Sequence, residues 1–165
     1  MNRNQMIMNQ LAQRPYLTDG GLETALIFLK GMDLPHFASF PLLHSESGRE
    51  VLEEYFLGFV DIADESGCGF VFESPTWRAH AVWGEIMDYD ADALDRVNQQ
   101  AIRFLSSLRD KRGGAAAGHL LSGCVGPKGD GYVADHAMNV QQARDYHLPQ
   151  VTSFAAAGAD MTTAM

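Results

Sequence analysis

The chain has 165 residues, of which 46% are hydrophobic, and its 12 basic and 21 acidic residues give a formal net charge of −9. This length suits one domain with a buried core, and the apolar content is typical of a globular protein. The acidic charge argues against binding to nucleic acid or to an anionic membrane surface, because both require basic patches. Two cysteines are too few for a disulfide framework or a closed zinc site. No apolar signal segment or membrane-spanning run is evident, so the expected location is cytoplasmic.

The first half of the chain alternates short apolar runs with amphipathic helices. A strand is predicted from Pro15 to Asp19, and a helix from Arg49 to Asp64, where apolar residues recur at helical spacing opposite acidic ones. Small residues then lead into a second strand, Phe70–Phe72. A second helix is predicted from Ala91 to Leu108, with Asp90 as its N-cap, because a carboxylate there accepts a hydrogen bond from a backbone N–H.

The same alternation continues in the second half of the chain. The apolar run Leu120–Val125 predicts a third strand, and a third amphipathic helix follows from Val140 to Ala157. Pro149 is expected to kink or split that helix, because proline has no N–H to donate. A fourth strand begins at Met161. Because apolar runs of this kind are typical of parallel strands, the order indicates an α/β fold with right-handed crossovers.

Two parallel architectures are compatible with this order, an open doubly wound sheet and part of a (β/α)8 barrel of the TIM type. Successive strands begin about 40–55 residues apart. Eight such units require roughly 300 residues or more, which is within the size range of large barrels. The barrel interpretation therefore predicts that residues 1–165 hold only about the first four β/α units, as the N-terminal part of one barrel domain with no second domain.

The turn Asp19-Gly20-Gly21 directly follows the first predicted strand. In parallel α/β folds the carboxyl ends of the strands carry the chemistry. Two glycines allow a tight turn and a close approach to a ligand, and the Asp19 carboxylate can bind an ammonium group. The alternative is a simple turn with an Asx-type hydrogen bond. Nucleotide-binding Gly-rich motifs are absent from the sequence.

The second predicted strand ends in the polar segment Glu73–Arg78. Its Glu, Ser, Thr, Trp and Arg residues exceed what packing requires, which favours a binding role. The alternative is a loop in which Trp77 covers the end of the barrel and Arg78 pairs with a surface acid. The loop Gly126–Tyr132 after the third strand either shapes the mouth of a pocket or is an ordinary connection.

The histidines and cysteines give no metal-ligand pattern. No histidine pair has the i, i+4 spacing of a helical metal site, and we interpret Cys68 and Cys124 as small buried apolar residues. We interpret the six histidines as structural: His36, His44, His80, His119, His136 and His147.

Several segments, taken in order, carry a family resemblance: Leu17–Thr24, Ala63–Gly69, Ser74–Ala79, Ser122–Gly129, Tyr146-His147 with Gln150, and Ala157–Asp160. They resemble the homocysteine S-methyltransferase family. The similarity is to its opening Asp-Gly-Gly strand end, its second strand and Thr-x-Thr-aromatic-x-Ala loop, its Gly-Ser-x-Gly-Pro-x-Gly stretch and the approach to its fourth strand. Together these segments cover nearly the whole chain.

The resemblance implies a (β/α)8 barrel that transfers a methyl group to the thiol of homocysteine and forms methionine. In the family a zinc ion holds the thiol as thiolate, which is the nucleophilic form. The methyl donor is a sulfonium, a quaternary ammonium or a methylcobalamin. The expected partners are therefore small molecules, namely homocysteine and a methyl donor.

The candidate substrate-binding residues lie at the predicted strand ends: Asp19, Gly20, Gly21, Glu73, Thr76, Trp77 and Arg78. By its match to the family, Asp19 contacts the amino group of homocysteine, and the amides near Gly20 and Gly21 shape that pocket. The segment from Thr76 to Arg78 matches the loop on the donor side. The Trp77 ring suits a cationic donor through cation–π attraction, which the charge of Arg78 opposes.

The chain departs from the family pattern in two ways. The family's three zinc cysteines lie in the second half of the barrel, beyond Met165, and neither Cys68 nor Cys124 matches them, so we expect residues 1–165 to hold no zinc and to be inactive alone. Met165 stands where the family has a homocysteine-binding Glu. Two alternatives therefore stay open: a non-catalytic half-barrel binding module, and a related barrel enzyme for a different thiol or small acid. Self-association through open sheet edges is a further expectation.

Overall fold

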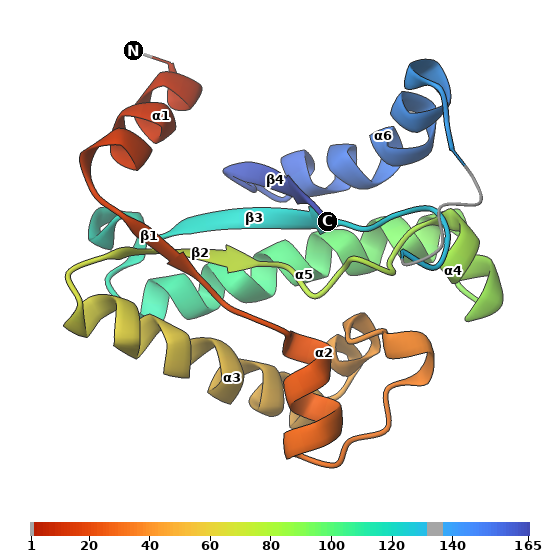
Figure 1. Ribbon diagram of the computed structural model, residues 1–165, viewed down its shortest axis with the longest axis horizontal. Helices are drawn as coiled ribbons and strands as arrows, with labels where there is room; N and C mark the ends of the chain where they lie inside the picture. Colours follow the sequence, from red (N-terminus) through yellow and green to blue (C-terminus); the bar gives the residue numbers. More distant parts are fainter. Residues whose placement is uncertain (1, 132–136) are drawn as a thin grey trace.

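A computed structural model describes residues 2–131 and 137–165, and its four strands form a single sheet (Figure 1). Every neighbouring pair in the sheet is parallel, and the strand order is β1-β2-β3-β4. The strands are β1 (Tyr16–Thr18), β2 (Gly69–Glu73), β3 (Leu120–Val125) and β4 (Met161–Ala164). All four predicted strands are therefore confirmed. Tyr132 of the predicted loop and His136 lie outside the described residues.

The helices are α1 (Arg3–Gln13), α2 (Leu22–Thr24), α3 (Glu46–Glu65), α4 (Ala81–Ile86), α5 (Ala91–Lys111) and α6 (Val140–Ala156). A π-helical turn continues α2 over Ala25–Leu29, and 3-10 turns occupy Pro35–Phe37, Phe40–His44 and Gly114–Ala117. The three predicted helices correspond to α3, α5 and α6. Each begins at a residue whose side chain accepts a backbone N–H, and Asp90 is the predicted N-cap of α5.

The two faces of the sheet are covered differently, which distinguishes the two architectures. Phe70, Phe72 and Leu121 are buried in one core with the apolar sides of α3, α5 and α6. Val71 and Leu120 point to the opposite face, where they form a smaller cluster with α1. A doubly wound sheet has a reversal in strand order and helices on both faces from its crossovers. Consecutive strand order with all crossover helices on one face is that of successive units of a (β/α)8 barrel.

The helices differ from the sequence prediction at α1, at the short helices α2 and α4, and at Pro149 in α6. Helix α1 was not predicted, because its sequence is largely polar and only Ile7 is buried. Helix α6 runs through Pro149 without a break, so the predicted split is wrong. Packing of α6 against α5 and β3 outweighs the missing N–H, and the hydroxyl of Ser153 donates to the Pro149 carbonyl at 3.0 Å.

Strands β1 and β4 form the two edges of the sheet, and each pairs with one strand among the described residues. Self-association through these edges stays a prediction. None of the helices within residues 2–131 and 137–165 is long and apolar enough to cross a membrane.

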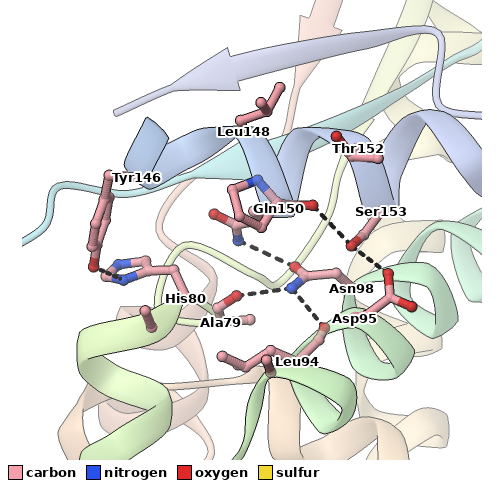
Figure 2. Close-up of a pocket in the computed structure, with 13 residues that line it drawn as sticks. Ala79, His80, Leu94, Asp95, Asn98, Tyr146, Leu148, Gln150, Thr152 and Ser153 are labelled. Atoms are coloured by element: carbon pink, nitrogen blue, oxygen red, sulfur yellow. Dashed lines mark hydrogen bonds between the residues drawn. The ribbon is translucent and has the colours of Figure 1, made fainter. Parts of the chain in front are cut away.

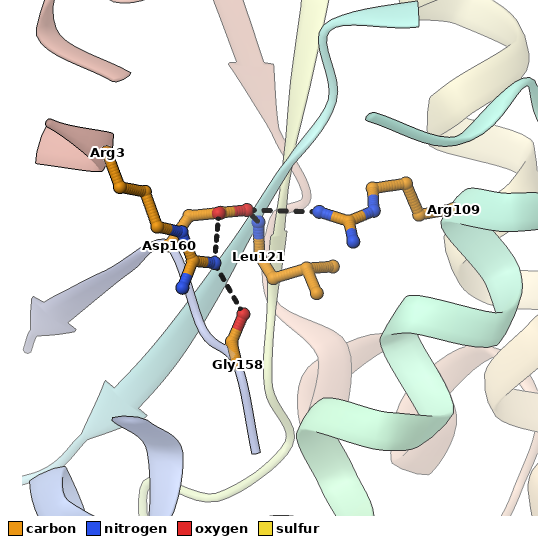
Figure 3. Close-up of polar contacts among 5 residues, drawn as sticks. All are labelled: Arg3, Arg109, Leu121, Gly158 and Asp160. Carbon is orange, nitrogen blue, oxygen red and sulfur yellow. Dashed lines mark hydrogen bonds and ion pairs between the residues drawn. The ribbon is translucent and has the colours of Figure 1, made fainter. Parts of the chain in front are cut away.

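Asp160, just before β4, joins three parts of the fold (Figure 3). Its carboxylate pairs with Arg3 of α1 at 2.7 Å and with Arg109 of α5 at 3.1 Å. It also accepts the backbone N–H of Leu121 at 2.9 Å, and its side chain is only 9% exposed. Asp160 therefore stabilises the end of the sheet opposite the carboxyl ends of the strands.

We expect Asp160→Ala to destabilise the fold by about 3 kcal/mol, because it leaves two guanidinium groups without their shared carboxylate. Thermal denaturation followed by circular dichroism should show a fall in Tm of roughly 6–12 °C. The control is Asp145→Ala, which removes an exposed pair with Arg144 at 3.6 Å and should cost less than about 0.5 kcal/mol. Equal losses in the two variants would contradict this role for Asp160.

Candidate active site at the carboxyl ends of the strands

The turn Asp19-Gly20-Gly21 connects β1 to α2 at the carboxyl end of the sheet. Gly21 is the N-cap of α2 and has a φ of 65°, in the left-handed region that glycine adopts without strain. The turn is fixed from outside by Tyr55 of α3, whose hydroxyl lies 3.0 Å from both an Asp19 carboxylate oxygen, Oδ2, and the Gly20 carbonyl oxygen. The other carboxylate oxygen of Asp19, Oδ1, is buried and accepts no hydrogen bond from the described residues.

The charges of two carboxyl groups, Glu73 and Glu23, act on the Asp19 carboxyl at this edge of the sheet. Burial raises the pKa of Asp19 to about 7; the charges of Glu73 and Glu23 act in the same direction, and the hydrogen bond from Tyr55 opposes them. Burial also raises the pKa of Glu23, which accepts a hydrogen bond from the buried Ser39. Because all three groups are acidic, this part of the site favours a positively charged ligand.

The loop after β2 is held against the end of β3 by buried hydroxyl groups. The Thr76 hydroxyl donates to the Cys124 carbonyl at 2.9 Å, and the Ser74 hydroxyl accepts the Cys124 N–H at 2.9 Å. The two hydroxyls also bond to each other at 2.6 Å. Thr76 is fully buried, so in this structure its hydroxyl positions the loop.

Arg78 occupies the face of Trp77 that the sequence suggested for a cationic donor. The guanidinium carbon lies 3.8 Å from the centres of both the Trp77 and the Trp83 rings. The same group donates to the carbonyls of Gly129 at 3.0 Å and Asp130 at 3.3 Å, and Arg78 is only 5% exposed. These contacts join the loops after β2 and β3.

A polar network on the helix side supports the same loop (Figure 2). The Gln150 amide donates to the Thr76 carbonyl at 2.8 Å and to the Asn98 side chain at 3.1 Å. Asn98 in turn donates to the carbonyls of Ala79 and Leu94, each at 2.8 Å. These bonds fix the loop relative to α5 and α6.

A groove of about 510 Å³ lies between α4, α5 and α6 beside this network (Figure 2). His80 and Tyr146 are among its lining residues and are 2.5 Å apart between Nδ1 and the phenol oxygen. Burial lowers the pKa of His80 to about 4, with the charges of His147 and Arg78 acting in the same direction, so the ring is neutral at pH 7. None of the sequence-predicted site residues lines this groove, so it is separate from the candidate site.

The chain thus forms a parallel sheet of barrel type whose strands end in polar residues. Comparison with known proteins shows which family has this sequence. The sequence model of the homocysteine S-methyltransferase family matches residues 16–164. The chain belongs to this family. The match extends from β1 to β4 and so includes every candidate site residue.

Two solved structures share the fold of this homocysteine S-methyltransferase family member. Both are of the homocysteine methyltransferase MmuM from Escherichia coli, in a metallated and an oxidized form, with TM-scores of 0.75 and 0.74. Each is 21% identical in sequence, so the likeness is one of fold. The alignments cover 99% and 98% of this chain, but 57% and 56% of the MmuM chains. No curated protein sequence matches the chain.

The described residues do not fit the zinc ion that the family implies. Across residues 2–131 and 137–165, no three His, Cys, Asp or Glu side chains are grouped so that they could hold a metal ion. Burial, with the charges of Glu73, Glu23 and Asp19, raises the pKa of Cys124 to about 12, so its thiol stays protonated. Cys68 precedes β2 at the opposite end of the sheet and is half-buried, whereas a buried position was predicted. No chemical step through a metal follows from these residues.

The structure brings some of the predicted residues together and adds others. Asp19, Gly20 and Glu73 lie in one acidic region at the ends of β1 and β2. Thr76, Trp77 and Arg78 lie in the loop after β2, where they contact one another, the end of β3 and the loop beyond it. Tyr55, Glu23, Ser39 and Trp83 were not predicted as site residues. Glu23 alone had a sequence signal, because it lies one turn after Asp19 inside the Leu17–Thr24 segment. The remaining three residues, Tyr55, Ser39 and Trp83, had no such signal in the sequence.

Proposed function

We propose that this chain contributes the homocysteine-binding part of a homocysteine S-methyltransferase. In this proposal homocysteine lies at the carboxyl ends of β1 and β2, with its ammonium group on the Asp19 carboxylate. The supporting observation is the Asp19 Oδ1 atom, which has no hydrogen-bond partner among the described residues and is close enough to Glu73 and Glu23 for their charges to raise its pKa. An ammonium group provides the missing donor and a positive charge that favours the ionised form of Asp19.

The proposed reaction moves one methyl group from the donor to the substrate sulfur. The thiol of homocysteine releases its proton to solvent, the thiolate attacks the methyl carbon, and the donor leaves with the electron pair of the bond that breaks. The family's zinc, which the described residues do not fit, would supply a Lewis acid for the thiolate. The residues of this chain bind and orient the amino acid. Because the chain spans 57% of the MmuM length, turnover by residues 1–165 alone is not part of the proposal.

Isothermal titration calorimetry with two matched ligands tests this proposal. L-homocysteine should bind at pH 8, and 4-mercaptobutyrate, which lacks only the amino group, should bind about 10–100-fold more weakly because a charge-assisted hydrogen bond is lost. The control is L-homocysteine added to Asp145→Ala, whose changed residue lies on the exposed surface of α6, and its Kd should be unchanged. Equal affinities for the two ligands would contradict the placement of the ammonium group on Asp19.

A different thiol or small acid is the second candidate substrate, and one observation favours it. Met165 follows β4, donates its backbone N–H to Val125 at 3.1 Å, and is 73% exposed. By the family resemblance a homocysteine-binding Glu belongs at this position, and a thioether cannot hold an ammonium group. A titration in which thiols without an amino group bind more tightly than homocysteine would favour this candidate. Binding of homocysteine without methionine formation would favour a non-catalytic binding module.

A further inference from the structure

Tyr55 connects helix α3 to the proposed substrate-binding carboxylate by a single, well-placed hydroxyl. The phenol oxygen is 3.0 Å from Oδ2 of Asp19 and 3.0 Å from the Gly20 carbonyl oxygen. Its ring is fixed by edge and tilted contacts with Phe56 and Phe59, whose ring centres are 5.3 and 5.1 Å away. These ring contacts and the two polar contacts of the hydroxyl favour one position for the Tyr55 phenol oxygen, and therefore one orientation of the Asp19 carboxylate.

The two oxygens of the Asp19 carboxylate therefore have different roles. Tyr55 bonds to Oδ2, whereas Oδ1 is buried and accepts no hydrogen bond from another residue in the part of the chain that the structure describes. A carboxylate held at one oxygen presents the other in a fixed direction, which lowers the entropy lost when a ligand binds.

From this geometry we propose that Tyr55 is a positioning residue: it holds Asp19 by Oδ2 and directs Oδ1 at the ammonium group of the substrate. This inference rests on the proposed function for the role of Asp19. It adds a residue on α3, a helix that contributes no predicted site residue, and it assigns the phenol a purpose beyond packing.

The charged and titratable groups that act on Asp19 come from three elements. Glu23 belongs to α2, Glu73 to β2 and Tyr55 to α3. The two carboxylates disfavour ionisation of Asp19, and the Tyr55 hydroxyl favours it by donating to the charged form. Without the hydroxyl, Asp19 should ionise at a higher pH and bind a cationic group less well at a given pH.

Tyr55→Phe tests the proposal, because it removes the hydroxyl and keeps the ring. Carbon-13 NMR titration of the Asp19 carboxyl should show an upward pKa shift, and calorimetry at pH 8 should show about tenfold weaker binding of L-homocysteine with little change for 4-mercaptobutyrate. The control is Tyr89→Phe, which removes a hydroxyl bonded to His44 at 2.9 Å and should leave both readouts unchanged.

The outcomes separate this proposal from the proposed function. An unchanged Asp19 titration and an unchanged homocysteine affinity in Tyr55→Phe would overturn the positioning role, whatever the variant does to Tm. Equal weakening for homocysteine and 4-mercaptobutyrate would also overturn it, because a loss independent of the amino group is structural. If the wild-type chain does not bind homocysteine, the proposed function fails, and the NMR titration then decides alone whether Tyr55 directs Asp19.

Discussion

At pH 8, Asp19→Asn should make the protein more stable than the wild type by about 2–4 kcal/mol while abolishing the binding of homocysteine. The physical reason is the environment of the carboxyl group. Burial, followed by the charges of Glu73 and Glu23, raises the pKa of Asp19 from 3.8 to about 7. An amide in the same place has no charge to bury, can still accept the hydrogen bond from Tyr55, and cannot form an ion pair with an ammonium group.

The stability difference between the two proteins should depend on pH in a defined direction. Below pH 3.8 the Asp19 carboxyl is protonated in both the folded and the unfolded wild type, so its titration contributes no difference. Between pH 3.8 and about 7 the unfolded chain loses this proton and the folded chain keeps it, which costs stability at about 1.4 kcal/mol per pH unit. Above that window the loss is complete, and the advantage of Asp19→Asn is largest.

Urea denaturation of the wild type and Asp19→Asn at pH 4, 6 and 8 measures this dependence. The difference in unfolding free energy should be smallest at pH 4 and should grow at each step. Asp33→Asn is the matched control, because Asp33 has an exposed side chain, and this variant should follow the wild type at all three pH values. A constant difference across the series would show that Asp19 has the same proton affinity in both states.

The fold was largely predictable because its signals are local. Strands such as Leu120–Val125 are short apolar runs between small residues, and α5 has a regular apolar stripe with Asp90 as its N-cap. The elements that sequence analysis missed have weak local signals. Helix α1 is polar and is fixed by long-range contacts, including the pair between Arg3 and Asp160. The split predicted at Pro149 is wrong because packing between α5 and α6 is not visible in the α6 sequence alone, while a kink there stays a prediction.

The candidate site was less predictable because its decisive contacts are distant in sequence. Tyr55 has the helical spacing of an apolar core residue, and only the folded chain places its hydroxyl beside Asp19, 36 positions earlier. Likewise, the Trp77 ring was predicted to suit a cationic donor, with the charge of Arg78 opposing it, and in the structure the Arg78 guanidinium itself lies over that ring. Residue type and strand-end position thus predicted the region of the sheet, but the partner of each side chain required the structure.

Gly126→Ala should be the most damaging small substitution at the site, with an expected loss of about 2–4 kcal/mol. Gly126 directly follows β3, and a Cβ atom there would lie 2.2 Å from the Trp77 carbonyl oxygen and 3.0 Å from its carbonyl carbon. Both atoms belong to the backbone, so no side chain can rotate away to relieve the overlap. The carbonyl cannot move freely either, because Thr76 and Arg78 on either side of it are bonded to the β3 end and the loop beyond.

Gly58→Ala should change stability in the opposite direction. It therefore distinguishes the effect of steric overlap at Gly126 from a general effect of replacing glycine by alanine. Gly58 lies on the exposed side of α3, and a Cβ atom there meets nothing within 4 Å. Gly58→Ala should therefore stabilise the protein by up to about 1 kcal/mol through helix propensity. Urea denaturation gives both free energies, and tryptophan fluorescence should change only in Gly126→Ala, because displacement of the Trp77 backbone separates its ring from Arg78. A Gly126→Ala protein with wild-type stability and native fluorescence would contradict the close contact between the loops after β2 and β3. It would also contradict the hydrogen bonds from Arg78 to the loop after β3.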